Sequence, residues 1–147
     1  MNPVFVDTSV LIAAEDTGNA ALYDAVLVWL DVLWRTRTGR TASQSLVEFY
    51  DQVTNDAQPM SQGDARAAIR RYQTWNPWKT DAATLETAWA VQARHELPFA
   101  DCLAVACAQH SGCELMLTLH LLHGVQYGGV TMVHPQKLAP HTKFEDA

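Results

Sequence analysis

The stretch Leu97-Pro-Phe-Ala-Asp-Cys-Leu-Ala-Val-Ala-Cys-Ala-Gln-His110 decides how the rest of the chain is organised. Every residue from Cys102 to Ala108 is apolar or small, and a helix that is apolar all round is buried. Pro98 stands where a helix can begin, and Ser111-Gly112 supply a stop before the apolar run at 115–117. The stretch therefore predicts a buried helix at the centre of the fold.

One charge, Asp101, lies in the first turn of this apolar helix. A carboxylate beside a buried element needs hydrogen bonds or a cation, because removing it bare from water is very costly. One interpretation is that Asp101 caps the helix and accepts hydrogen bonds from free backbone N–H groups. The other is that Asp101 belongs to an acidic cluster that binds a metal. Taken alone, the stretch favours the first interpretation.

Length and composition are those of one globular domain over residues 1–147. The chain has 147 residues, of which 48% are hydrophobic and 18% are charged, and a domain typically holds about 100–200 residues. The formal net charge of −6 argues against long-range attraction to nucleic acid over the whole surface. It leaves room for a local patch of positive charge.

Cysteine usage and hydropathy bear on the compartment. Cys102, Cys107 and Cys113 lie inside or beside apolar runs without CxxC spacing, which is typical of core residues in a reducing compartment. No secretory signal is visible at the N-terminus, and no apolar run approaches the ~20 residues of a membrane helix. We therefore expect a cytoplasmic protein with no membrane partner.

Short apolar runs alternate with helical patterns along the chain. Strands are predicted at residues 4–6, 40–42, 115–117 and 130–133, with a loop over 118–129 that ends in Gly128-Gly129. Helix starts are expected at Thr8 or Ser9, Gly18 or Asn19, Ser43 or Ser45, Ser61 and Asp81, with stops at Gly39 and at 57–59. Strands separated by helices predict a three-layer α/β/α fold with a central, mostly parallel sheet.

Two further acids need an explanation. Asp7 follows the first strand, and in open α/β sheets the working crevice lies at the carboxyl ends of the strands. Asp7 is therefore either a functional residue or part of an N-cap, and both possibilities stay open. Glu48 projects away from the apolar stripe of its helix, so its spacing alone indicates a solvated glutamate.

Four motifs together resemble a known family. Val-Asp-Thr-Ser-Val-Leu-Ile at 6–12, Ser-Leu-Val-Glu-Phe-Tyr at 45–50 and Phe-Ala-Asp-Cys-Leu-Ala-Val-Ala-Cys-Ala at 99–108 resemble the three acidic motifs of PIN domains. The closing run from Met116 to Pro135 is similar to the end of the VapC-type toxins within that family. The resemblance spans nearly the whole chain, with the motifs in the right order.

The resemblance implies a metal-dependent endoribonuclease, the toxin of a bacterial type II toxin–antitoxin pair, which cleaves RNA phosphodiesters with a metal-activated water. The metal-binding and catalytic acids would be Asp7, Glu48 and Asp101, and Ser9 and Thr118 would be small hydroxyl residues that line the site. The implied cofactor is Mg²⁺ or Mn²⁺, because both ions prefer oxygen ligands.

The implied partners are the RNA substrate, a cognate antitoxin and a second copy of the chain in a homodimer. Aromatic residues of the early helices are candidates for the antitoxin surface, although core packing is the commoner fate of such residues: Trp29, Trp34, Phe49 and Tyr50. Exposed cations are weak candidates for RNA phosphate contacts, against the alternative of an ordinary solvated face: Arg66, Arg70, Arg71 and Lys79.

The chain departs from the family pattern at His120. Two residues after Thr118 the family usually carries a fourth acid, so one negative charge that would hold the metals is missing here. If His120 reaches the crevice, its imidazole suits Mn²⁺ or Zn²⁺ better than Mg²⁺. If it points to solvent, the second metal site is simply weak, and we slightly favour this outcome. The remaining histidines match no zinc-ligand spacing and are expected on the surface or in loops: His123, His134 and His141.

Other functions fit the residues less well. The alternative that stays open is a PIN-like module with weakened catalysis that binds RNA or a partner. A phosphoacceptor signalling domain would have paired acids after the first strand and a lysine after a late one, and neither is present. A nucleotide-binding frame would need a Gly-rich phosphate loop after the first strand, and this is absent as well.

Overall fold

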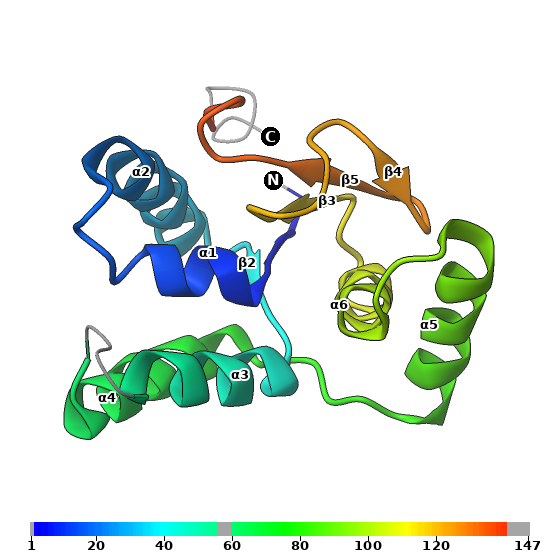
Figure 1. Ribbon diagram of the computed structural model, residues 1–147, viewed down its shortest axis with the longest axis horizontal. Coiled ribbons are helices and arrows are strands. Elements are labelled where there is room, and N and C mark those ends of the chain that lie inside the picture. The colour runs from blue at the N-terminus through cyan, green and yellow to red at the C-terminus, as the bar shows by residue number, and fades with distance from the viewer. Residues whose placement is uncertain (1, 56–59, 141–147) are drawn as a thin grey trace.

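The computed structural model of the chain describes residues 2–55 and 60–140. Figure 1 shows helices on both sides of a central sheet. In chain order the elements are β1 (Val4–Val6), α1 (Thr8–Ala13), α2 (Ala20–Thr36), β2 (Gly39–Arg40), α3 (Ser43–Thr54), α4 (Gln62–Tyr72), the 3₁₀ turn η1 (Gln73–Trp75), α5 (Ala82–His95), α6 (Phe99–His110), β3 (Leu115–Leu117), β4 (Gln126–Tyr127) and β5 (Val130–Val133).

The sheet has the strand order β2-β1-β3-β5-β4, in which every neighbouring pair is parallel except β4 with β5. The prediction of a central, mostly parallel sheet between helices is therefore confirmed. Strand β4 was not expected, because a two-residue strand with one polar residue carries no apolar pattern. The residues predicted as a loop instead end in a hairpin, whose turn glycines Gly128 and Gly129 have φ of 56° and 82°.

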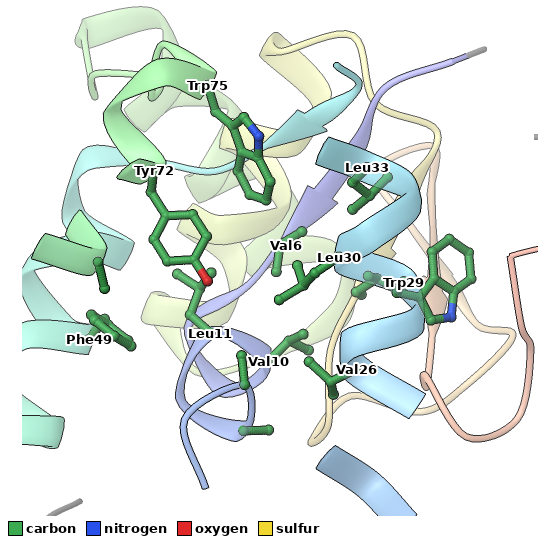
Figure 2. Packing of buried hydrophobic residues seen from close by; sticks show 14 of the residues in the cluster. Val6, Val10, Leu11, Val26, Trp29, Leu30, Leu33, Phe49, Tyr72 and Trp75 are labelled. Atoms are coloured by element: carbon green, nitrogen blue, oxygen red, sulfur yellow. The ribbon is translucent and has the colours of Figure 1, made fainter. Parts of the chain in front are cut away.

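Side chains of the central strands alternate between two cores. In β1, Val4 and Val6 pack with α1, α2, α3 and α4, whereas Phe5 packs with α5 and α6. Figure 2 shows the first of these cores, where Leu30 of α2 lies beside Val6. This alternation is what allows helices to cover both faces. Trp29 is fully buried, and removing a side chain of this size from a core costs about 3–5 kcal/mol.

The candidates for an antitoxin surface among the early aromatic residues lie largely in this core. Trp29 and Phe49 are completely buried, and Tyr50 is partly buried against the same cluster. The ring of Trp34 lies 4.5 Å from that of Trp75. Packing thus explains these residues, as aromatic side chains at helical spacing usually serve the core.

Helices begin at or next to each of the expected positions, but two of the expected capping residues are wrong. Asn19, Ser61 and Asp81 each cap a helix with their side-chain oxygen. Helix α1 is capped by Asp7 rather than by Thr8 or Ser9. Helix α3 begins at Ser43, but its N-cap is Ala42 and it has no side-chain cap, so the expectation that Ser43 or Ser45 caps it is wrong. The predicted break at 57–59 lies outside the described residues.

Gly39 was expected to end the second helix, but it lies in β2, and α2 ends at Thr36 followed by Arg37 in the left-handed conformation. The reason for a glycine here is the indole of Trp75. A Cβ added to Gly39 would lie 2.3 Å from that ring. The glycine therefore serves the packing of η1 on the sheet edge. In the described ranges, no helix combines the length and hydropathy that crossing a bilayer requires.

Candidate functional site: a carboxylate cleft

A cleft of ≈ 280 Å³ lies at the carboxyl end of β1, between α1, α3 and α6. Asp7, Glu48, Asp101 and His120 all contribute to its lining. These residues come from four separate segments of the chain, so only the fold brings them together. We call this hollow the carboxylate cleft.

Asp7 joins β1 to α1 and serves as the N-cap of that helix. Its backbone N–H donates to the carbonyl of Leu117 at 3.1 Å, which ties the end of β1 to β3. Its Oδ1 accepts hydrogen bonds from the backbone N–H of Ser9 and from Ser9 Oγ, the latter at 2.8 Å. Asp7 is only 3% exposed. The side chain of Asp7 therefore both caps α1 and lines the cleft, two roles that the sequence left as alternatives.

Glu48 lines the cleft from α3. Three turns of this helix face the cleft with Gln44, Ser45, Glu48 and Gln52, while its apolar stripe faces the core. The Oε2 atom of Glu48 accepts a hydrogen bond from Thr8 Oγ1 at 3.0 Å. The glutamate is half-buried. Spacing alone indicated a solvated residue, and the structure instead places Glu48 beside the other two acids.

Asp101 lies in the first turn of α6, whose N-cap is Pro98. The capping interpretation of Asp101 is therefore wrong, since its side chain bonds elsewhere. Its Oδ1 lies 2.7 Å from Nε2 of His120, in the loop after β3. His120 thus reaches the cleft rather than pointing away from it, although its side chain is still 52% exposed.

The environment of His120 favours its protonated form. Burial acts to lower the pKa of the imidazole, but the hydrogen bond with Asp101 and the negative charges of Asp7 and Asp101 outweigh it. The pKa of His120 is therefore raised above the ordinary value of 6.5. When it is protonated, the imidazole supplies positive charge to the cleft.

The donor atoms of the carboxylate cleft are of the chemical type that binds a hard divalent cation. Each of the three carboxylates uses one oxygen in the hydrogen bonds above, and within the described residues the second oxygen accepts none. Carboxylate oxygens are the ligands that Mg²⁺ and Mn²⁺ prefer. As the side chains stand, the described part of the chain holds no group of three or more His, Cys, Asp or Glu residues placed to share one ion. Coordination therefore requires the carboxylates to rotate towards one another.

The two hydroxyl residues implied by the resemblance differ in position. Ser9 lines the cleft, and its Oγ accepts a hydrogen bond from the backbone N–H of Leu119 at 3.1 Å, which links α1 to the loop that carries His120. Thr118 is completely buried and does not appear in the lining. Its Oγ1 has no hydrogen-bond partner among the described residues.

The predicted RNA-binding cations do not line the carboxylate cleft. The three arginines are exposed on α4, and Lys79 is exposed in the segment that leads to α5. Thr8, Gln44 and Gln52 line the cleft and were not predicted. Thr8 stood next to Asp7 in the first acidic motif, and that adjacency was the one available signal.

The remaining histidines lie apart from the cleft lining. His123 is half-buried, and its Nδ1 accepts a hydrogen bond from the backbone N–H of His134 at 3.0 Å. Both residues are in loops, as expected. His141 lies outside the described residues.

Comparison with known proteins agrees with this geometry. The family model named PIN domain matches residues 4–119, a span that includes Asp7, Glu48 and Asp101. No curated protein matches the sequence. The fold is similar to the crystal structure of Mycobacterium tuberculosis VapC20, a sarcin-ricin loop cleaving toxin, with a TM-score of 0.59 and 24% sequence identity, over 77% of this chain and 86% of that one. Since the family model covers well over half of its length, the chain belongs to the PIN domain family.

Proposed function

We propose that this chain is a metal-dependent endoribonuclease and acts in the cytoplasm as the toxin of a type II toxin–antitoxin pair. The observation that carries the proposal is the convergence of Asp7, Glu48 and Asp101 on one cleft at the carboxyl end of β1. Membership of the PIN domain family supports a ribonuclease. The similarity of fold to VapC20 supports the toxin class.

The three acids would hold Mg²⁺ or Mn²⁺ through the oxygens that their present hydrogen bonds leave free. A divalent ion bound there would acidify an attacking water and neutralise charge on the leaving oxygen of the phosphodiester. Asp7 is suited to be the fixed ligand, because two hydrogen bonds from Ser9 hold its carboxylate. Glu48 and Asp101 would turn towards it from α3 and α6.

The neighbours of the acids have supporting roles in this proposal. Thr8 orients Glu48 through the 3.0 Å hydrogen bond from its hydroxyl. His120 neutralises part of the negative charge that three carboxylates bring into one cleft, because it is hydrogen-bonded to Asp101. Without such a cation or a metal, the carboxylates would repel one another.

One observation favours a second candidate function. Where the family usually has a fourth acid, the imidazole of His120 occupies one oxygen of Asp101. If the pair of His120 and Asp101 keeps the metal out of the cleft, the protein would bind RNA or a partner without cleaving RNA efficiently. Metal-dependent turnover separates this binding module from the ribonuclease.

The experiment that tests the ribonuclease follows cleavage of candidate RNAs by the purified chain with Mg²⁺ and with Mn²⁺. Asp101→Asn should lower cleavage by about a hundredfold or more, because charge stabilisation by a bound metal is worth several kcal/mol. Asp51→Asn is the matched control, since Asp51 is exposed on α3 outside the cleft lining. Normal cleavage by the Asp101 variant would refute the assignment of the site.

The toxin class has a separate test. A toxic nuclease must be held inactive, so we expect an antitoxin whose segment covers the carboxylate cleft, on a toxin dimer. The product of the adjacent reading frame should co-purify with the chain and suppress cleavage. A chain that is harmless to its host at high expression and has no such neighbour would contradict the toxin assignment and favour the binding module.

A further inference from the structure

Figure 1 shows where α5, α6 and the β4–β5 hairpin lie in the fold. Residues of these elements line a second cleft. Its volume is ≈ 650 Å³, and it shares no lining residue with the carboxylate cleft. Its polar lining comes from Thr87, Arg94 and His95 on α5, Gln109 on α6 and Gln126 on β4. We call this hollow the hairpin groove. The function proposed above makes no use of it.

The polar side chains of the hairpin groove are available to a ligand. Within the described residues, the guanidinium of Arg94 and the carboxamides of Gln109 and Gln126 have no hydrogen-bond or ion-pair partner. His95 packs edge-on against the ring of Tyr127, with 5.0 Å between centroids, which orients its imidazole. Among the described residues that line the groove, none is Asp or Glu, although the chain carries a net charge of −6. The groove therefore suits an anionic ligand that also has hydrogen-bonding edges.

Two glycines let the hairpin approach both helices closely. Gly128 and Gly129 both have positive φ, as in the tight turns of two-residue hairpins. A Cβ added to Gly128 would lie 3.1 Å from Oε1 of Gln109 and 3.3 Å from side-chain carbons of Val91 and Val105. The turn thus rests directly on α5 and α6, and it holds Gln109 at the wall of the groove. The groove is part of the packed fold rather than a gap between loose segments.

We propose that the hairpin groove binds one unpaired nucleotide of the RNA substrate, close along the strand to the phosphodiester in the carboxylate cleft. Arg94 contacts a phosphate, since guanidinium pairs well with phosphate oxygens. The carboxamides of Gln109 and Gln126 each donate and accept, so they read the edge of a base, and this chemistry suits adenine best. The volume falls in the range of about 300–1,000 Å³ that is typical of small-ligand sites.

Helix α6 connects the two sites. Asp101 lines the carboxylate cleft and Gln109 lines the hairpin groove, eight residues further along the same helix. This separation corresponds to a rise of about 12 Å and a turn of about 80° around the helix axis. The two sites therefore lie on neighbouring sides of α6, within reach of one strand. Because the ligand is part of an RNA strand, the proposal rests on the ribonuclease function proposed above.

The test uses the full-length Asp101→Asn chain without divalent metal, so that no cleavage interferes. AMP is titrated and followed through the backbone and side-chain amide signals in NMR spectra, with CMP for comparison. AMP should shift the signals of Gln109, Gln126 and Gly129 and should bind more tightly than CMP. Adding Arg94→Ala should weaken AMP binding by about tenfold, the loss expected for one charge-assisted phosphate contact. Arg35→Ala is the matched control, because it removes an exposed arginine on α2.

Three results would overturn the proposal. They are shifts confined to the carboxylate cleft, equal AMP affinity with and without Arg94, and binding of an acidic peptide in the groove where AMP does not bind. Cleavage kinetics of the otherwise unchanged chain separate this inference from the proposed function. Normal cleavage with an unchanged KM in Arg94→Ala would contradict the nucleotide site in the hairpin groove but not the ribonuclease function. AMP binding in the groove of a chain that cleaves no RNA supports the groove and contradicts the ribonuclease.

Discussion

Nε2 of His120 lies 2.7 Å from Oδ1 of Asp101, so an imidazole is hydrogen-bonded to one of the three acids of the carboxylate cleft. The contact joins the loop after β3 to the first turn of α6, across 19 residues of sequence. We infer that His120 balances part of the charge of the acids rather than joining them as a ligand, because its Nε2 is hydrogen-bonded to Asp101.

The first prediction concerns substitutions of His120. His120→Ala should leave Mn²⁺ affinity unchanged or higher, because it frees Asp101 and removes a cation from the cleft. His120→Asp should strengthen Mg²⁺ binding, since it adds a hard oxygen ligand where the family usually has one. Calorimetric titration with each metal measures both effects. A clear loss of Mn²⁺ affinity in the alanine variant would show that His120 is a ligand after all.

A second prediction follows from the contact between Thr8 and Glu48. Thr8→Val keeps the shape of the side chain but removes the hydroxyl that donates to Glu48 Oε2 at 3.0 Å. Hydrogen bonds to charged groups are worth about 1.5–3 kcal/mol, so we expect cleavage to fall by about tenfold or more without loss of the fold. Thr54→Val is the control, because the Thr54 hydroxyl bonds a carbonyl within the same helix. Equal activity of the two variants would exclude a positioning role for Thr8.

The third prediction tests the packing of β2. A Cβ at Gly39 would lie within 2.3 Å to 2.8 Å of three atoms of the Trp75 indole. Gly39→Ala should therefore lower the free energy of unfolding by about 1–3 kcal/mol or more, as overpacking does. Gly63→Ala provides a contrast, since Gly63 lies in α4 with open space around its Cβ position. That change should raise stability by up to about 1 kcal/mol. Denaturant unfolding distinguishes the two, and equal stabilities would contradict the contact.

The fourth prediction concerns pH and His134. Burial, together with the positive charges of Lys137 and His123, lowers the pKa of His134 below 6.5. Its Nδ1 also accepts a hydrogen bond from the backbone N–H of Gln136 at 3.1 Å, which requires an unprotonated nitrogen. Because the unfolded chain binds this proton more readily, His134 contributes stability above pH 6.5 that is lost as pH falls through its folded-state pKa.

Thermal unfolding of the parent and of His134→Asn between about pH 5 and 7.5 measures this contribution. The Asn side chain keeps an acceptor for Gln136 but does not titrate in this range. The parent should lose stability relative to the variant as pH falls. A difference in thermal stability between parent and variant that does not change with pH would contradict the lowered pKa of His134.

The sequence predicts the strands, the helices and the candidate acidic residues better than it predicts the contacts between side chains in the site. The strands at 4–6, 115–117 and 130–133 are confirmed because each is a short apolar run bounded by turn or cap residues, which favours a buried strand. The buried helix is confirmed for a similar reason, since seven consecutive apolar or small residues leave it no polar face. Such local patterns do not show which residues face one another across the fold.

The contacts within the site depend on tertiary structure. Thr8 and Glu48 are 40 residues apart, and neither carries a local signal for the other. Glu48 looked solvated because helical periodicity separates apolar from polar faces, but does not say which part of a polar face borders a cleft. Strand β4 was missed because its pairing with β5 depends on the glycine turn rather than on apolar residues.

The most direct test of the proposed site is the paramagnetic broadening of backbone amide signals by Mn²⁺. If Asp7, Glu48 and Asp101 share an ion, broadening at low Mn²⁺ should centre on the residues around these three positions and should disappear in Asp101→Asn. Glu15 and Asp64 line a separate hollow of ≈ 360 Å³ and serve as an internal reference for adventitious acidic binding. Broadening that centres on that hollow, or that persists unchanged in the Asp101 variant, would contradict a metal site in the carboxylate cleft.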